Sequence, residues 1–335
     1  MLRAVPSTIT IAASRLAALR SGILSSAISR ICAFVIAATL VLFGTPEPLS
    51  IPQAFLISTA DKIDKHYHNF LKKDKKGKER LLYSADNVLQ SVHDKINKLL
   101  NTLDYPINIQ GGIAGRSIVT NASIHVGKKY VANYDIKNFF PSVNYKIVYR
   151  SFEKQKCTPE VCRMLTRFTT ADGCLPQGFA TSPKVSGLVL YSSNFRIETL
   201  LKPYDLAHTF WIDDLTVSGN RPIKKFQKLF YKIFKQEGFS LHDDPKKARI
   251  TDSQHRQTCT GLIINQELNP EKGLKDKVRK ELFLCKKFGV SNFLKEHNSP
   301  FDKDRYLRKL AGNISFLCSV NKKNFIFKEQ LKLIK

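Results

Sequence analysis

Residues 208–219 constrain the fold most, because apolar and polar residues alternate on both sides of an aspartate pair. This alternation predicts a strand, a two-residue turn at Asp213 and Asp214, and a second strand. Asp is common in turns, so an exposed hairpin tip is the simplest interpretation. The large apolar residues that flank the pair, such as Phe210 and Trp211, argue instead for substantial burial. Two adjacent carboxylates in a buried hairpin repel each other and need cations, which suits a divalent-metal site for phosphoryl transfer.

The charge balance indicates a polyanionic partner. The 335-residue chain has 54 Lys and Arg against 28 Asp and Glu, a formal charge of +26. Such an excess favours nucleic acid first and an anionic membrane surface second. Hydrophobic residues make up 43% of the chain, which predicts a folded protein with a sizeable core. Charge alone does not separate an enzyme from a purely binding protein.

The cysteines and two early histidines carry no metal or disulfide signature. Seven cysteines include no Cys-x-x-Cys pair, so we expect reduced thiols and a cytoplasmic location. His66 and His68 have no third ligand at a suitable spacing, which favours a structural or solvent role.

Residues 1–48 differ from the rest of the chain and form an N-terminal extension of open role. No acidic residue occurs before Glu47, and residues 31–43 form an apolar run broken only by Thr39. That run is short for a membrane-spanning helix and is closer to a signal-peptide core or an interfacial helix. Translation from an upstream start codon is a third alternative. We therefore exclude the extension from the prediction of the fold.

Three further segments place polar groups where elements are expected to begin or end. The basic run 72–80 is either a hairpin that covers phosphates or a solvated loop. Asp135 ends a predicted strand, 130–136, where it either caps the next helix or supplies a third carboxylate. The turn 174–183 offers backbone N–H groups to an anion, with Ser182 as cap and Pro183 as first residue of the following helix.

The rest of the chain predicts a helix that opens at residues 84–86, short strands near 238–241, 246–250 and 260–265, and basic helices after Pro270. One helical face carries Leu274, Val278, Leu282 and Cys285, and a second carries Leu307, Leu310, Ile314 and Leu317. Lys interleaved with aromatic residues suits a nucleic-acid cradle, although surface charge beside an ordinary helical core has the same pattern.

Taken in order, three segments resemble sequence motifs A, B and C of reverse transcriptases: Asp135-Ile-Lys-Asn-Phe-Phe-Pro-Ser-Val, Leu175-Pro-Gln-Gly-Phe-Ala-Thr-Ser-Pro and Trp211-Ile-Asp-Asp. Asn121-Ala-Ser-Ile-His125 is similar to the Asn-Ala-x-x-His element of bacterial retron reverse transcriptases. Cys259-Thr260-Gly261 stands where those enzymes usually have Val-Thr-Gly. The resemblance covers roughly residues 50–335 and identifies the chain as retron-like.

The resemblance implies an α+β, right-hand polymerase with an antiparallel palm sheet and a helical thumb. Residues 49–255 would form the fingers and palm, and residues 256–335 the end of the palm and the basic thumb. Three departures stand out: Trp-Ile-Asp-Asp replaces Tyr-Ala-Asp-Asp, Cys259 replaces Val, and residues 242–245 interrupt motif D.

The site residues are carried over from the family by motif position. Two Mg²⁺ ions would be bound by Asp135, Asp213 and Asp214. The incoming nucleotide would meet Phe140, Gln177, Gly178, Arg80 and Lys247. The RNA would be bound by Asn121, His125, Thr260 and Gly261.

The resemblance also implies a reaction and partners. The enzyme would use deoxynucleoside triphosphates and a structured non-coding RNA, as both primer and template, to make branched RNA–DNA (msDNA). It would act with an effector protein in antiphage defence, and a membrane partner is not expected. Two alternatives are another defence-associated reverse transcriptase lineage with different priming, and an inactive RNA-binding descendant. The three aspartates argue against the second.

Overall fold

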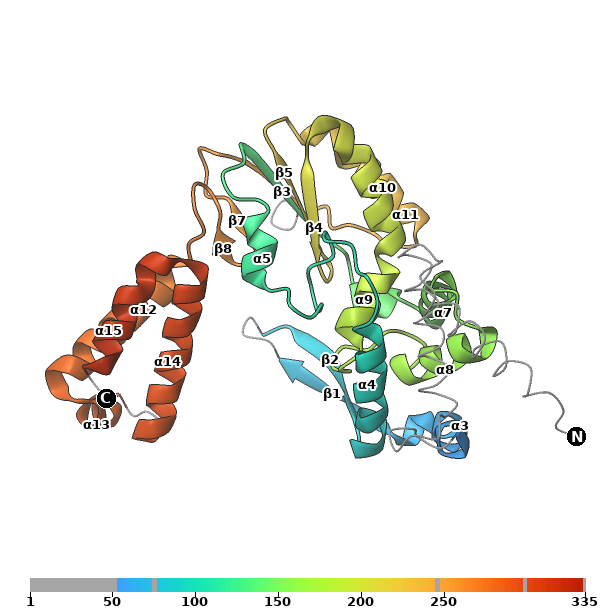
Figure 1. Ribbon diagram of the computed structural model, residues 1–335, viewed down its shortest axis with the longest axis horizontal. Helices are drawn as coiled ribbons and strands as arrows, with labels where there is room; N and C mark the ends of the chain where they lie inside the picture. Colours follow the sequence, from blue (N-terminus) through green and yellow to red (C-terminus); the bar gives the residue numbers. More distant parts are fainter. Residues whose placement is uncertain (1–52, 74–76, 245–247, 298–299, 334–335) are drawn as a thin grey trace, which may run out of the picture. The chain divides into compact units, whose positions relative to one another are not determined.

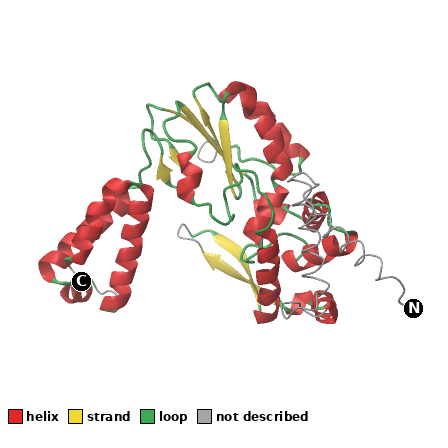
Figure 2. Cartoon of the chain, viewed as in Figure 1, coloured by secondary structure: helices red, strands yellow, loops and turns green. Residues whose placement is uncertain are grey.

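The computed structural model describes residues 53–73, 77–244, 248–297 and 300–333. The N-terminal extension and Lys247 lie outside them. The chain forms two compact units that alternate along the sequence. The first holds the described residues up to Gly115, with Ile136–Ile197 and Tyr231–Leu241. The second holds Arg116–Asp135, Glu198–Phe230 and His242 onward. Both units mix helices with antiparallel strands (Figures 1 and 2).

The first unit contains a two-stranded hairpin followed directly by a helix. Strands β1 (Tyr67–Lys73) and β2 (Glu79–Ala85) pair antiparallel, after α3 (Gln53–Asp61) and η1 (Ile63–Lys65). Helix α4 (Asn87–Leu100) starts after β2 because the Asp86 carboxylate accepts a hydrogen bond from the backbone N–H of Leu89. This confirms the predicted helix start, and the apolar face of α4 is buried as its periodicity indicates.

Short helices make up most of the remaining first unit: α6 (Phe139–Ser142), α7 (Tyr145–Lys154), α8 (Pro159–Thr169) and α9 (Ser182–Val189). The expected cap of α9 was wrong. Ser182 is the first residue of that helix and its hydroxyl donates to the carbonyl of Pro176, while Thr181 occupies the cap position without a side-chain bond. The Ser182 hydroxyl therefore closes the preceding turn instead of the helix end.

The second unit is organised around a four-stranded antiparallel sheet with strand order β4-β5-β3-β6. The strands are β3 (Tyr130–Asp135), β4 (Ala207–Trp211), β5 (Asp214–Gly219) and β6 (Arg249–Asp252). Five of six residues in β5 are buried, and the middle of β4 is buried as well. The expected burial of the 208–219 hairpin is thereby confirmed.

The elements joined to this sheet include α5 (Ile118–Ser123) and the small hairpin of β7 (Thr258–Cys259) and β8 (Leu262–Ile263). The predicted strand 260–265 was wrong at its start. Thr260 and Gly261 form a two-residue turn with φ of 46° and 81°, a left-handed pair that glycine favours. Within the described ranges, residues 238–241 form no strand and contribute one isolated bridge, between Leu241 and Ile136.

Further helices lie between the sheet strands in the sequence. Before β4 come α10 (Tyr191–Leu201) and η2 (Lys202–Tyr204), and after β5 come η3 (Lys224–Phe226) and α11 (Gln227–Gln236). The C-terminal part contains α12 (Lys272–Phe288), α13 (Val290–Glu296), α14 (Lys303–Val320), η4 (Lys322–Phe325) and α15 (Ile326–Lys332). Val278, Leu282 and Cys285 of α12 share a core with Leu310, Ile314 and Leu317 of α14. The two helical faces expected from the sequence are therefore confirmed. No helix within the described ranges has the length and apolar character needed to cross a bilayer.

Candidate functional site

Three aspartates lie at one end of the four-stranded sheet. Asp135 is the last residue of β3 and Asp214 is the first of β5, and the two are directly opposite each other in the antiparallel register. Asp213 belongs to the loop between β4 and β5. Directly opposed residues point to the same face of a sheet, so Asp135 and Asp214 form a cross-strand pair. The sheet thus brings together the carboxylates that the sequence places 79 residues apart, from position 135 to position 214.

The turn differs by one residue from the sequence prediction. Trp211 pairs with Asp214, so the two loop residues are Ile212 and Asp213, and Asp214 is already in the strand. This register is what sets Asp214 opposite Asp135. Ile212 has a φ of 57°, in the left-handed region that a β-branched side chain rarely adopts. Such strain persists only where the surrounding structure imposes it, and it is typical of functional sites.

The electrostatics of the pair favour a cation. Two carboxylates directly across a strand pair repel each other. His242 contributes to this environment: its Nε2 lies 3.8 Å from Asp135 Oδ2, and its backbone N–H donates to the Asp135 carbonyl at 2.9 Å. Asp214 is exposed, while Asp135 and Asp213 are half-buried. The carboxylates are therefore open to a ligand and not sequestered in the core.

The donor set fits Mg²⁺ bound together with a substrate. Within the described ranges, no three His, Cys, Asp or Glu side chains converge on a ready-made metal site. Mg²⁺ is commonly bound by one or two carboxylates plus substrate phosphates, and not by an all-protein cage. The Asp135–Asp214 pair supplies that kind of oxygen donor set, with Asp213 beside it in sequence.

The predicted nucleotide residues that the structure describes lie in the first unit. Phe140 is half-buried in α6, with its ring edge-on to that of Phe139 at 5.5 Å. The carbonyl of Gln177 accepts the backbone N–H of Tyr83 at 2.7 Å. At Gly178, with φ of 118°, a Cβ would overlap the Tyr83 carbonyl oxygen, so glycine is required there. Exposed Arg80 lies on β2, opposite Lys72.

Two residues predicted to bind RNA, Asn121 and His125, are buried, and their contact with RNA stays a prediction. Asn121 and His125 have no exposed surface. The His125 ring bridges the hairpin, with Nε2 2.8 Å from Thr209 Oγ1 of β4 and Nδ1 2.7 Å from Ser218 Oγ of β5. Burial lowers the pKa of His125 to about 3, so the ring is neutral at neutral pH. His125 therefore stabilises the β4–β5 hairpin, which carries Asp213 and Asp214.

Asn121 belongs to a second buried polar chain. Its Nδ2 donates to Cys259 Sγ at 3.3 Å and lies 3.4 Å from Thr260 Oγ1. The Cys259 thiol in turn donates to Thr216 Oγ1 at 3.6 Å, two residues from Asp214 on β5. Burial raises the pKa of the Cys259 thiol, so it stays protonated and able to donate. Sequence reasoning missed Thr216 because an isolated Thr in a strand gives no signal of its partners.

Thr260 and Gly261 form the tip of the β7–β8 hairpin, where Gly261 is exposed and a Cβ at its position would meet no neighbouring atom within 4 Å. Of the four residues predicted to bind RNA, these two therefore occupy a place that a ligand can reach. Their contact with RNA stays a prediction.

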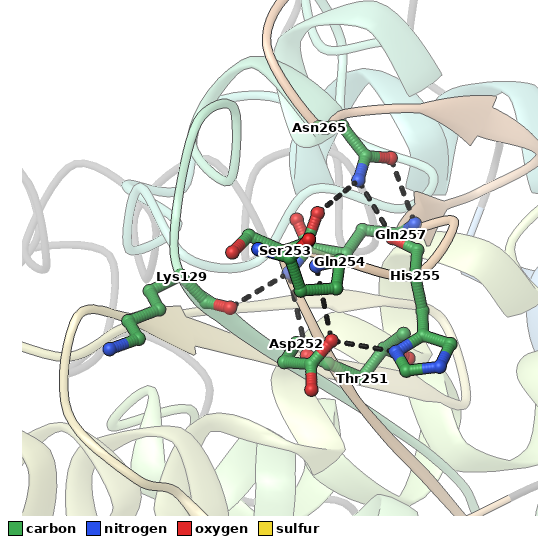
Figure 3. Close-up of polar contacts among 8 residues, drawn as sticks. All are labelled: Lys129, Thr251, Asp252, Ser253, Gln254, His255, Gln257 and Asn265. Atoms are coloured by element: carbon green, nitrogen blue, oxygen red, sulfur yellow. Dashed lines mark hydrogen bonds and ion pairs between the residues drawn. The ribbon is translucent and has the colours of Figure 1, made fainter.

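A further polar network fixes this hairpin to the sheet (Figure 3). The buried Gln257 side chain donates from Nε2 to the carbonyls of Lys129 at 3.1 Å and Thr251 at 3.4 Å. Asn265 accepts the backbone N–H of Gln257 at 2.9 Å and donates to the carbonyl of His255 at 2.7 Å. These bonds determine where the segment after β6 leaves the sheet.

Comparison with known proteins agrees with this geometry. Residues 70–264 match the family described as reverse transcriptase (RNA-dependent DNA polymerase). The chain is 28% identical over 225 residues to the retron Se72 reverse transcriptase of Salmonella heidelberg, a match over 64% of this chain and 59% of that protein. It is 28% identical over 260 residues to the retron Ec86 reverse transcriptase of Escherichia coli, over 75% and 76% of the two chains. A third relative, the retron Mx162 reverse transcriptase of Myxococcus xanthus, is 27% identical over 60% of this chain and 47% of its own length.

The match spans about half to three quarters of these relatives. The family match covers more than half of the chain and contains all three aspartates, and every relative named here is a retron enzyme. The resemblance expected from the motifs is confirmed: the chain belongs to the reverse transcriptase family, of the retron type.

Proposed function

We propose that the chain is an RNA-directed DNA polymerase that copies a structured non-coding RNA by two-metal-ion nucleotidyl transfer. The observation that carries the proposal is the Asp135–Asp214 cross-strand pair beside Asp213, within a sequence that matches the reverse transcriptase family. In this proposal the four-stranded sheet is the palm, the β1–β2 hairpin belongs to the fingers, and α12 to α15 form the thumb.

Asp135, Asp213 and Asp214 would hold the metal ions. When bound by these residues, Mg²⁺ would supply a lowered pKa for the primer hydroxyl and charge neutralisation for the triphosphate and the leaving pyrophosphate. The carboxylates would fix where this chemistry takes place, and the direct opposition of Asp135 and Asp214 in β3 and β5 supports this role. The buried His125 and Cys259 bonds hold β4 and β5, the hairpin that carries Asp213 and Asp214.

The remaining residues would select and orient the nucleotide. Gln177 and Gly178 would position it through a turn held against β2, and Arg80 would contact the triphosphate as an exposed cation. Lys247 would have a similar part, by its place in the sequence. Phe140 would block a ribose 2′-OH.

The Phe140 role has a direct test. Phe140→Ala should let the enzyme incorporate ribonucleotides on an RNA template, because the space filled by the ring becomes available to a 2′-OH. Phe195→Ala is the matched control, since Phe195 is exposed on α10 and has no assigned part in the site. The ratio of deoxyribonucleotide to ribonucleotide incorporation measures the discrimination of each variant against ribonucleotides. Unchanged discrimination in Phe140→Ala contradicts the assignment.

The retron relatives support a narrower proposal: the RNA is primer and template, and the product is msDNA made in antiphage defence with an effector protein. The basic helices α12 and α14 suit the phosphate backbone of a folded RNA, where shape and 2′-OH contacts provide selectivity. Expression with the native flanking DNA, followed by RNase and debranching enzyme, tests this. A single short DNA whose mobility shifts only after debranching supports it. A free or protein-linked 5′ end, or products from many RNAs, indicates a lineage with different priming.

A further inference from the structure

A two-residue turn at Asp172 and Gly173 precedes the segment that carries Gln177. Ala171 and Cys174 exchange two backbone hydrogen bonds, of 2.9 and 3.0 Å, and the residues between them have φ of 47° and 77°. Both central residues in the left-handed region define a type I′ turn, for which Asp-Gly is a preferred pair. The turn is followed within five residues by Gln177, so its position determines where the nucleotide-binding turn begins.

The Asp172 carboxylate gathers three donors from the β1–β2 hairpin. Tyr67 donates its hydroxyl at 3.0 Å, Tyr83 at 2.9 Å, and Asn69 Nδ2 lies at 3.5 Å. Asn69 and Tyr83 are directly opposite in the hairpin register, and Tyr67 is two residues from Asn69, so the three share one face. Burial, together with the hydrogen bond to Asp172, raises the pKa of Tyr67 to about 12, which keeps this hydroxyl protonated as a donor. Bonds to an ionised acceptor are stronger than those between neutral groups.

Aromatic packing also connects the β1–β2 hairpin to the segment 172–179. The ring of buried Phe179 lies edge-on to Tyr67 at 5.9 Å and to Tyr83 at 6.4 Å. The two tyrosine rings are themselves edge-on at 6.0 Å. Edge-on pairs at these separations are favourable beyond the area they bury. Phe179 follows Gly178 directly, so the hydroxyls and the rings attach the hairpin at both ends of the segment 172–179.

The backbone of Tyr83 makes the third attachment. Its N–H donates to Gln177, and its carbonyl fills the space where a Cβ of residue 178 would be. Beyond its base the hairpin is exposed: this holds for all of β1 after Tyr67 and for Glu79, Arg80 and Leu81 of β2. Arg80 is three residues from Tyr83, about 10 Å along the strand. Arg80 therefore lies on the exposed part of a hairpin whose base is held by these attachments.

We infer that Asp172 is a positioning residue for nucleotide binding: its carboxylate, through Tyr67, Asn69 and Tyr83, sets the β1–β2 hairpin and Arg80 against the turn of Gln177 and Gly178. This inference rests on the proposed function, because it assigns these two elements to the incoming nucleotide. It adds a residue outside the reverse transcriptase motifs quoted above, and it acts through other side chains and not on the reacting atoms.

Steady-state primer extension on an RNA template provides the functional test. Asp172→Ala should raise the KM for the incoming nucleotide about tenfold while kcat stays within about twofold, because the aspartates that carry the chemistry are unaltered. Tyr83→Phe, which keeps the ring on Phe179, should shift KM in the same direction by less. Combined with Asp172→Ala it should add little, since both remove the same bond. Asp172→Asn, nearly identical in shape, provides a milder variant should the alanine protein not fold.

Asp64→Ala is the matched control. The Asp64 carboxylate accepts from the same Tyr67 hydroxyl at 3.1 Å, yet it lies in η1 and not in the segment that carries Gln177. This control should leave KM unchanged. An unchanged KM in Asp172→Ala and Asp172→Asn, a fall in kcat alone, or an equal effect of Asp64→Ala overturns the inference.

Hydrogen exchange separates this inference from the proposed function. The Tyr83 amide, bonded to Gln177, should exchange at least about tenfold faster in Asp172→Ala than in the wild type, whether or not the protein polymerises DNA. Normal exchange there overturns the positioning role. A wild-type protein that makes no DNA while the Tyr83 amide still responds to Asp172→Ala contradicts the proposed function instead.

Discussion

The β4–β5 and β1–β2 hairpins resemble each other in length and differ in what holds them. The β4–β5 hairpin is buried along nearly its whole length, with strained Ile212 at its tip. The β1–β2 hairpin is exposed except near its base, where Tyr83 is buried and its hydroxyl is bonded to Asp172. Core packing thus fixes the hairpin that carries Asp213 and Asp214, whereas polar and aromatic contacts at its base fix the hairpin that we assign to the nucleotide. This difference is consistent with a rigid position for the aspartates of β4–β5 and with a more mobile β1–β2 hairpin.

Truncating one phenylalanine in each hairpin should show the largest contrast. Phe210→Ala removes a ring with no exposed surface in β4 and should lower the free energy of unfolding by about 3–5 kcal/mol. Phe70→Ala removes a ring that is 43% exposed in β1 and should cost under about 1 kcal/mol. Urea unfolding of both variants measures the difference. Equal losses would mean that the β1–β2 hairpin has a packed core that its exposure does not indicate.

Acid should destabilise the buried β4–β5 hairpin through His208 in β4 and through His125, which is hydrogen-bonded to both strands. Burial lowers the pKa of His125 to about 3 and of His208 to about 4, below the ordinary value of about 6.5. A depressed histidine pKa means that the unfolded chain binds the proton more tightly. Stability is therefore complete above about pH 6.5 and falls as the pH drops toward the folded-state values, by up to about 1.4 kcal/mol per pH unit for each ring.

Unfolding measured from pH 7.5 to 4.5 tests this pH dependence. His125→Asn should reduce the steepness of the loss below about pH 6.5 while lowering stability at pH 7.5, because its bonds to Thr209 and Ser218 are lost. His68→Asn is the control, since His68 is exposed in β1. A pH profile that is the same in His125→Asn as in the wild type contradicts the assignment.

Relief of strain at the tip of β4–β5 should give the smallest effect. Ile212→Gly removes a β-branched side chain from a left-handed position and should raise the free energy of unfolding by about 1 kcal/mol. Ile263→Gly, in strand β8, should lower it by about the same amount because glycine weakens a regular strand. Thermal unfolding of the two glycine variants and the wild type measures both changes in stability. A loss in Ile212→Gly equal to that in Ile263→Gly would show that the tip is unstrained.

The elements that sequence predicted well are those whose signals are local. The start of α4 follows from one aspartate, and the faces of α12 and α14 follow from helical periodicity. The turn register was one residue off because alternating residues fit a turn at 212–213 as well as one at 213–214.

Partners distant in sequence could not be predicted. His125 is bonded to residues 84 and 93 positions away, and Asp172 to a tyrosine 105 positions away. Asn121 and His125 were predicted to bind RNA from a family motif, and their burial could not be read from the sequence. The three aspartates were proposed as a site because family motifs mark them, and the pairing of Asp135 with Asp214 across β3 and β5 needed the sheet itself.

The most direct measurement of the central claim is Mg²⁺-dependent DNA synthesis by purified Asp213→Asn on an RNA template. The substitution removes one hard oxygen ligand and keeps the shape of the side chain. Asp205→Asn, in the left-handed turn before β4, makes the same change away from the site. Synthesis by Asp213→Asn should fall at least about a thousandfold, with RNA binding within about twofold because phosphate contacts dominate affinity. Asp205→Asn should keep full activity. Full-length cDNA from Asp213→Asn would contradict the assignment of the aspartates.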